Sequence, residues 1–184
     1  SKTGRLLLVP ALGEILANHN QEYDVVSVGT TGNAYVNNVT AEASGGVIIH
    51  PDFCLPANLS QKIVQQFGGW PEKAMPNGPR MNKAVQILTE YIVAERHPAV
   101  SLIWFSEPDS SQHASGVGSQ SSERALGAAD AAFGLLLEWL KKQGQTTNTN
   151  ILVTSDHGYS TIRESVDVKS AIQNSSLGTE IADG

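Results

Sequence analysis

An apolar run that ends in an acid and a histidine occurs twice in this chain and constrains its fold more than any other feature. Residues 100–107 form the first run, and Asp109 and His113 follow it. Ile151–Ser155 forms the second, and the pair Asp156-His157 follows at once. Each run predicts a strand, and parallel strands in one open sheet end at the same edge, where ligands bind. The sequence therefore predicts one metal site that is built from these two acid–histidine ends.

The predicted ligands have the chemistry that a divalent ion prefers, namely carboxylate oxygen and imidazole nitrogen. The i, i+4 spacing of Asp109 and His113 lets them converge on one helical turn, and Gly158 lets the chain bend after Asp156-His157. Two carboxylates ~4 Å apart near a protein surface repel by about 4 kcal/mol, and a divalent ion removes that cost. In the alternative interpretation these side chains only cap loops and helices, and Asp109 is an ordinary turn residue.

The remaining segments alternate between the residue spacing of helices and the apolar runs of strands. Helical spacing predicts helices at Pro10–His19, 59–67, 79–96, 121–144 and 166–172, whereas β-branched or apolar runs predict strands at Tyr23–Val28, Gly46–Pro51, Val100–Glu107 and Ile151–Ser155. We expect a loop over 110–120 and an irregular Pro- and Gly-rich segment over 70–79, which would lie over a cleft. Short, fully apolar strands between helices predict an α/β fold with a mostly parallel central sheet covered by helices on both faces.

Two of the predicted helices have a definite apolar face. In the helix over 79–96 the face consists of Met81, Val85, Leu88, Tyr91 and Ile92. In the helix that begins near Ser121 it consists of Leu126, Ala129, Phe133, Leu136, Leu137 and Leu140, and Gly144 is the expected stop.

Length and composition exclude several classes of protein. The 184 residues are enough for one domain over 1–184, and the net charge of −6 with scattered basic residues predicts no nucleic-acid surface. No apolar run approaches the ~20 residues of a membrane span. The single Cys54 is expected to be a small buried hydrophobe. Sequons at Asn38, Asn58 and Asn174 favour an extracytoplasmic or secreted location.

Three further features leave alternatives open. The turn Gly29-Thr30-Thr31-Gly32 could present backbone N–H groups to phosphate, but it is also an ordinary turn after a strand. His50 at a strand end could be a metal ligand, but such a residue is more often a hydrogen-bonded structural group. His97 is expected to be a solvated residue at a helix end.

The two acid–histidine motifs resemble those of the alkaline phosphatase superfamily, in particular its type I phosphodiesterase and nucleotide pyrophosphatase branch. Residues 107–113, Glu-Pro-Asp-Ser-Ser-Gln-His, are similar to the branch's Glu-Pro-Asp-x-x-x-His, and residues 154–158, Thr-Ser-Asp-His-Gly, contain its Ser-Asp-His-Gly. Weaker similarity to related bacterial and fungal members covers 28–34 and 50–53.

This resemblance implies an alkaline-phosphatase-like domain with two divalent metal ions, usually zinc, and a small phosphate ester as substrate. Asp109 and His113 would bind one ion, and Asp156 and His157 the other. The family also uses a Thr or Ser nucleophile and a further Asp before this region and a last His after it, and no residue here matches those three. We therefore expect the chain to be the middle section of a larger metal-dependent hydrolase domain, with the nucleophile upstream of Ser1, and to be inactive alone.

Other activities of the same superfamily stay open, because the nucleophile and the substrate pocket distinguish them. They are phosphomonoesterase, phosphonate hydrolase, sulfatase and phosphomutase. A hypothesis from a different class is a non-catalytic or degenerate metal-binding domain.

Overall fold

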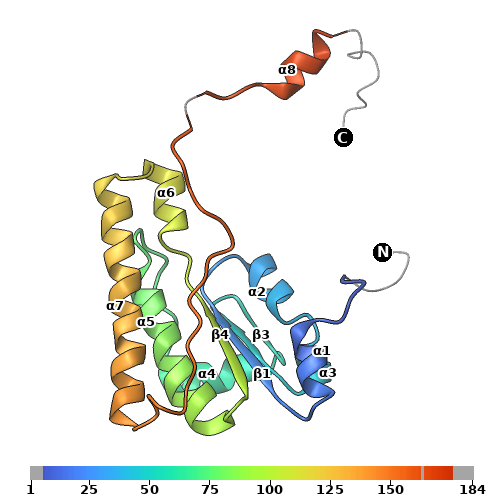
Figure 1. Cartoon of the computed structure of the whole chain (residues 1–184), viewed down its shortest axis with the longest axis vertical. Helices are drawn as coiled ribbons and strands as arrows, with labels where there is room; N and C mark the ends of the chain where they lie inside the picture. Colours follow the sequence, from blue (N-terminus) through green and yellow to red (C-terminus); the bar gives the residue numbers. More distant parts are fainter. Residues whose placement is uncertain (1–5, 163, 176–184) are drawn as a thin grey trace. The chain divides into compact units, whose positions relative to one another are not determined.

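The computed structural model describes residues 6–162 and 164–175 of the chain (Figure 1). The chain forms two compact units, 1–154 and 155–184. The expectation of a single domain over 1–184 stays a prediction.

A four-stranded sheet forms the centre of the first unit. Its strands are β1 (Tyr23–Ser27), β2 (Ile48–His50), β3 (Phe53–Leu55) and β4 (Val100–Trp104), in the order β3-β2-β1-β4. Strand β1 pairs in parallel with both β2 and β4, whereas β3 forms an antiparallel hairpin with β2. The predicted α/β class with a mostly parallel sheet is confirmed.

Helices cover both faces of this sheet (Figure 1). One face packs against α1 (Leu12–Ala17), α2 (Thr31–Asn37) and α3 (Ala41–Ser44); the other packs against α4 (Leu59–Phe67), α5 (Gly78–Ile87), η1 (Leu88–Arg96) and α7 (Gln120–Lys142). The two-residue period of a strand explains this double burial, because Val25 lies in the first core and Val26 in the second, and both are fully buried.

The predicted helix over 79–96 is present, but its backbone changes along its length. Helix α5 continues without a break into η1, which is a π-helix, and the final His97 N–H donates to the Ile92 carbonyl. The predicted apolar face is confirmed, since all five of its residues are buried. His97 ends the helix with a left-handed φ of 55° and is exposed, as expected.

The apolar face predicted for the longest helix is partly wrong. Leu126 and Leu137 of α7 are 60% and 40% exposed, whereas Ala125 and Ala132 are fully buried. Small side chains allow α7 to approach α5 closely, and a Cβ placed on Gly78 of α5 would lie 3.5 Å from the Ala128 Cβ. The other four predicted residues, Ala129, Phe133, Leu136 and Leu140, are buried or half-buried, so the prediction was wrong for the two exposed leucines and missed the two buried alanines.

The predicted strand over Ile151–Ser155 is not formed, and this prediction is wrong. Its apolar residues have no sheet to bury them, since Leu152 is 89% and Val153 74% exposed. Strand β4, which pairs only with β1, is an edge of the sheet. In the second unit, α8 (Val168–Gln173) confirms the weak helix that was expected near its position.

A close backbone contact makes Gly46 essential to the sheet. A Cβ on this buried residue would lie 2.2 Å from the Tyr23 carbonyl oxygen of β1. We expect Gly46→Ala to lower the free energy of unfolding by about 3 kcal/mol, at the upper end of overpacking costs, as measured by urea unfolding. Gly127→Ala on the exposed side of α7 meets no atom within 4 Å of its new Cβ and should raise stability by about 0.5–1 kcal/mol. Equal stability of the two variants would contradict this account.

Candidate metal centre

The carboxyl ends of β1, β2 and β4 bring three chain segments to one edge of the sheet. They are the turn at Gly29-Thr30, the strand-end residue His50, and the segment from Ser106 to His113 that leaves β4. Open parallel sheets bind ligands at this edge, because the strand ends leave a crevice there. The first predicted ligand pair lies in the third segment.

Asp109 and His113 meet on one turn of helix α6 (Asp109–Ser115). Their Oδ1 and Nε2 atoms lie 3.4 Å apart, and the side chains are 49% and 64% exposed. A loop was expected over 110–120, and its first half is instead this helix, which Pro108 precedes at the N-cap position. The i, i+4 spacing predicted this convergence correctly.

Asp156 and His157 form the corresponding pair in the second unit. The His157 N–H donates to Asp156 Oδ1 at 3.1 Å, and the His157 Nε2 atom lies 3.7 Å from Asp156 Oδ2. Both side chains are 53% exposed. A bend in the chain was expected at Gly158. The His157 Nδ1 atom lies 2.9 Å from the Gly158 carbonyl oxygen, which agrees with such a bend.

Each pair fits half of a zinc coordination shell. A pair supplies one carboxylate and one imidazole, both accessible to solvent, whereas a tetrahedral zinc site takes four donors. Across residues 6–162 and 164–175, no three His, Cys, Asp or Glu side chains lie close enough together to hold a metal ion. The donor types are those that a divalent cation prefers, but each pair supplies only two donors.

The first residue of the motif at 107–113, to which the sequence assigned no role, is a buried carboxylate that holds the start of α6 in place. Glu107 is 5% exposed; its Oε2 atom accepts the Ser111 N–H at 3.0 Å, and its Oε1 atom accepts the Asn77 N–H at 3.0 Å. The Asn77 Nδ2 atom also donates to Ser106 Oγ at 3.2 Å. The irregular segment expected over 70–79 is thus tied to the exit of β4.

His50 has a structural role in this fold. Its side chain is 2% exposed, its Nε2 atom lies 3.1 Å from the Gly29 carbonyl oxygen, and its Nδ1 atom accepts the Asp52 N–H at 3.1 Å. A neutral imidazole protonated on Nε2 satisfies both contacts. Of the two interpretations of His50, the structure supports the hydrogen-bonded one.

The Gly-Thr-Thr-Gly turn begins a helix that was not predicted. Thr30 is the N-cap of α2, and its Oγ1 atom accepts the Asn33 N–H at 3.3 Å. An N-cap threonine satisfies an amide that the helix itself leaves unpaired. The turn thus has a local structural role.

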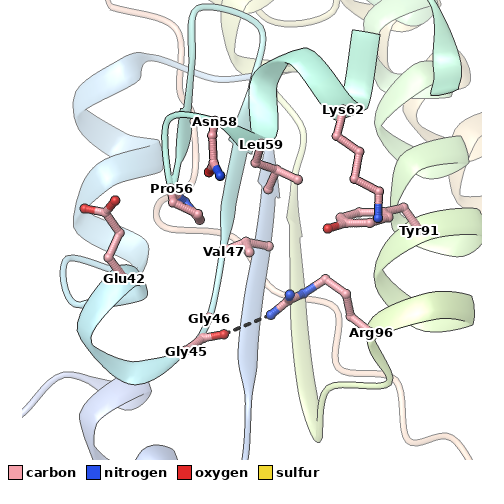
Figure 2. A pocket seen from close by; sticks show the side chains of 10 residues that line it. All are labelled: Glu42, Gly45, Gly46, Val47, Pro56, Asn58, Leu59, Lys62, Tyr91 and Arg96. Atoms are coloured by element: carbon pink, nitrogen blue, oxygen red, sulfur yellow. Dashed lines mark hydrogen bonds between the residues drawn. The ribbon is translucent and has the colours of Figure 1, made fainter. Parts of the chain in front are cut away.

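A cavity of about 360 Å³ lies at the opposite edge of the sheet (Figure 2). Gly46 and Val47, which precede β2, line it together with Lys62 and Arg96. Its cations already have partners, because Lys62 pairs with Glu95 at 3.1 Å and Arg96 donates to the Gly45 carbonyl oxygen at 2.9 Å. The cavity therefore has the character of a structural hollow, and neither Asp109 nor His113 lines it.

Two further expectations concern single residues. Cys54 is 5% exposed, and burial raises the pKa of its thiol, which confirms the expected small buried hydrophobe. Asn38 is fully buried and its Nδ2 atom donates to the Tyr23 carbonyl oxygen at 2.8 Å, so its sequon is inaccessible in the folded chain. Asn58 and Asn174 are exposed.

The sheet is open and mostly parallel, and an acid–histidine pair follows the end of one of its strands. Both features are typical of α/β proteins that bind ligands at the carboxyl ends of their strands. Residues 21–184 match the family "Type I phosphodiesterase / nucleotide pyrophosphatase", and the chain belongs to this family of hydrolases. The predicted family is confirmed.

Individual relatives match a shorter stretch. The chain is 43% identical over 61 residues to ectonucleotide pyrophosphatase/phosphodiesterase family member 3 of Mus musculus. This matched stretch covers 33% of the chain and 7% of the relative. It is 31% identical over 70 residues to family member 7 of Rattus norvegicus, covering 38% of this chain and 16% of the relative. The matched stretches thus span less than a fifth of the relatives' length.

No solved structure matches the chain. None of the helices in the described ranges has the length and apolar character of a membrane span.

Proposed function

We propose that this chain is a section of a two-metal phosphoric ester hydrolase of the phosphodiesterase or nucleotide pyrophosphatase type. Asp109 and His113 hold one divalent ion, most simply zinc, and Asp156 and His157 hold the other. The observation that carries the proposal is the 3.4 Å Asp109–His113 pair at the carboxyl edge of the sheet, in a chain of this family. The printed names of the relatives support a phosphodiester or pyrophosphate substrate.

The chain's own residues supply charge and donor atoms. When bound, two cations polarise a phosphoryl oxygen and neutralise the oxygen that leaves. The carboxylates of Asp109 and Asp156 balance the charge of the cations, and the imidazoles of His113 and His157 bind in their neutral form. The side chains of both pairs are between 49% and 64% exposed, although the Asp109 Oδ1 atom itself is buried, so a phosphate ester can reach these side chains without any opening of the core.

The attacking group comes, in this proposal, from a Thr or Ser outside residues 1–184. Its hydroxyl oxygen bonds to phosphorus while the ester bond to the leaving alcohol or nucleotide breaks, and the hydroxyl proton passes through solvent to the leaving oxygen. Water then attacks the same phosphorus, releases phosphate or a phosphate monoester, and restores the hydroxyl.

One observation favours a second candidate, a non-catalytic metal-binding or degenerate domain. Neither unit, taken by itself over its described residues, contains three His, Cys, Asp or Glu side chains grouped so that they could hold a metal ion. This candidate predicts that a longer protein containing the chain also lacks a hydroxyl nucleophile, and sequencing the reading frame on both sides distinguishes the two.

Hydrolysis of bis(p-nitrophenyl) phosphate tests the proposal. With added zinc we expect no turnover by residues 1–184 alone and zinc-dependent turnover by the longer protein. In the longer protein Asp109→Asn should lower kcat/KM more than ~100-fold, since even indirect supports of a metal ligand are each worth about 10–100-fold. Asp130→Asn on the exposed side of α7 is the matched control and should change little. Rapid hydrolysis by residues 1–184, or full activity of Asp109→Asn, would refute the proposal.

A further inference from the structure

The Glu107 carboxylate connects three parts of the chain at the exit of β4. It is almost fully buried, and each of its oxygens accepts a backbone N–H, one from Ser111 within α6 and one from Asn77 before α5. Both bonds are 3.0 Å long. A carboxylate that is satisfied in this way holds its two donors in fixed positions.

The bond to Ser111 acts directly on the candidate ligands. Ser111 lies between Asp109 and His113 in the first turns of α6, and its amide is one of those that a helix start leaves without an intrahelical partner. Because Glu107 accepts this amide, the turn that brings Asp109 Oδ1 within 3.4 Å of His113 Nε2 is anchored to the sheet. A helix of seven residues has little stability of its own and depends on such an anchor.

Asn77 completes the anchor from the other side. Its backbone N–H is bound by Glu107, and its side-chain Nδ2 atom donates to Ser106 Oγ at 3.2 Å. Asn77 is itself 1% exposed and starts helix α5, which belongs to the core. Helix α6 is therefore held in place by contacts with the start of α5 as well as by its connection to β4.

We infer that Glu107, supported by Asn77, is a positioning residue that sets the distance between the metal-binding side chains of Asp109 and His113. This inference rests on the proposed metal site and adds to it a residue that binds no metal. A glutamine at position 107 keeps the shape of the side chain but turns one of the two acceptors into a donor. One buried backbone N–H then loses its acceptor, and the turn is free to move.

The test uses the full chain with Asp156→Ala and His157→Ala, so that only the first pair remains to bind metal. Zinc affinity is measured by isothermal titration calorimetry with zinc chloride. We expect Glu107→Gln to weaken binding about tenfold, the lower end of the effect of residues that orient metal ligands. Glu138→Gln, with the same change of charge on an exposed position of α7, should leave the affinity unchanged. Hydrogen exchange of the Ser111 amide without metal should become faster in Glu107→Gln only.

The controls separate this inference from the metal proposal. If Asp109→Ala with His113→Ala leaves zinc binding unchanged, the metal site itself is refuted. If that double change abolishes binding while Glu107→Gln binds as tightly as the unchanged chain, only the positioning role is refuted. Should Glu107→Gln prove unfolded at the titration temperature, Glu107→Asp decides, because it keeps two acceptor oxygens but is one methylene too short to reach both the Ser111 and the Asn77 N–H. Weaker zinc binding by a folded Glu107→Asp supports the role, and unchanged binding overturns it.

Discussion

The combined substitution of Asp109 and Asp156 by alanine is expected to remove zinc from the protein. Each pair then keeps a single imidazole, and one donor does not hold a zinc ion that takes four. The expected loss of affinity exceeds ~100-fold, because the ligands themselves are removed and not only their supports. Zinc content is measured by mass spectrometry of protein that is purified without chelator.

A matched pair of aspartates serves as the control for this prediction. Asp52 and Asp130 are exposed acids outside the acid–histidine motifs, and their replacement by alanine should leave the zinc content unchanged. Residues 1–184 alone are expected to hold zinc weakly or in part. A longer protein that contains no zinc before the substitution, or equal zinc after it, would contradict the metal assignment.

Loss of the Arg96 guanidinium is expected to destabilise the first unit more than any other single change on its surface. The Asp24 carboxylate in β1 is fully buried, and Arg96 donates to it from Nε at 2.7 Å and from Nη2 at 3.2 Å. The Val47 N–H donates to the same carboxylate at 2.9 Å. Arg96→Met leaves a buried charge without its partner, so the free energy of unfolding should fall by about 3–5 kcal/mol. Urea unfolding followed by circular dichroism measures this change.

The exposed ion pair between Lys62 and Glu95 is the natural comparison. Its side chains are 52% and 40% exposed, and Lys62 also lies 4.3 Å from the centre of the Tyr91 ring. Lys62→Met should therefore cost at most about 1 kcal/mol. A loss of similar size for both variants would show that burial of Asp24 does not control the strength of the Arg96 pair. Asp24→Asn should recover part of the stability that Arg96→Met loses.

The fold class followed from local pattern because the strands here are short, apolar and separated by helices. Tyr23–Ser27 and Val100–Trp104 appear as strands close to the predicted limits. Every residue of Tyr23–Ser27 is buried, as expected of a central strand between helices, whereas Val100–Trp104 at the edge of the sheet is exposed to half-buried. The strand predicted at Ile151–Ser155 had the same composition and did not form. An apolar run becomes a strand only when a neighbouring strand pairs with it, and composition alone does not provide that neighbour.

The candidate site was predictable only in part. The Asp109–His113 contact follows from helical spacing, which is a local property of the sequence. The role of Glu107 was not predictable, because its partner Asn77 is 30 residues away in an irregular segment. Such a bond depends on tertiary packing, and in the sequence Glu107 was notable only as the first residue of the Glu-Pro-Asp-x-x-x-His match. The buried Ala125 and Ala132 of α7 were missed for a similar reason, since close helix packing selects small residues over large ones.

Nitrogen chemical shifts of the five histidines during a zinc titration test the central claim most directly. Long-range proton–nitrogen correlation spectra of the chain resolve each imidazole separately. We predict that the ring nitrogens of His113 and His157 shift on addition of zinc, whereas those of His19, His50 and His97 do not. Shifts confined to these three other histidines, with His113 and His157 unchanged at saturating zinc, would contradict the assignment of the acid–histidine pairs as metal ligands.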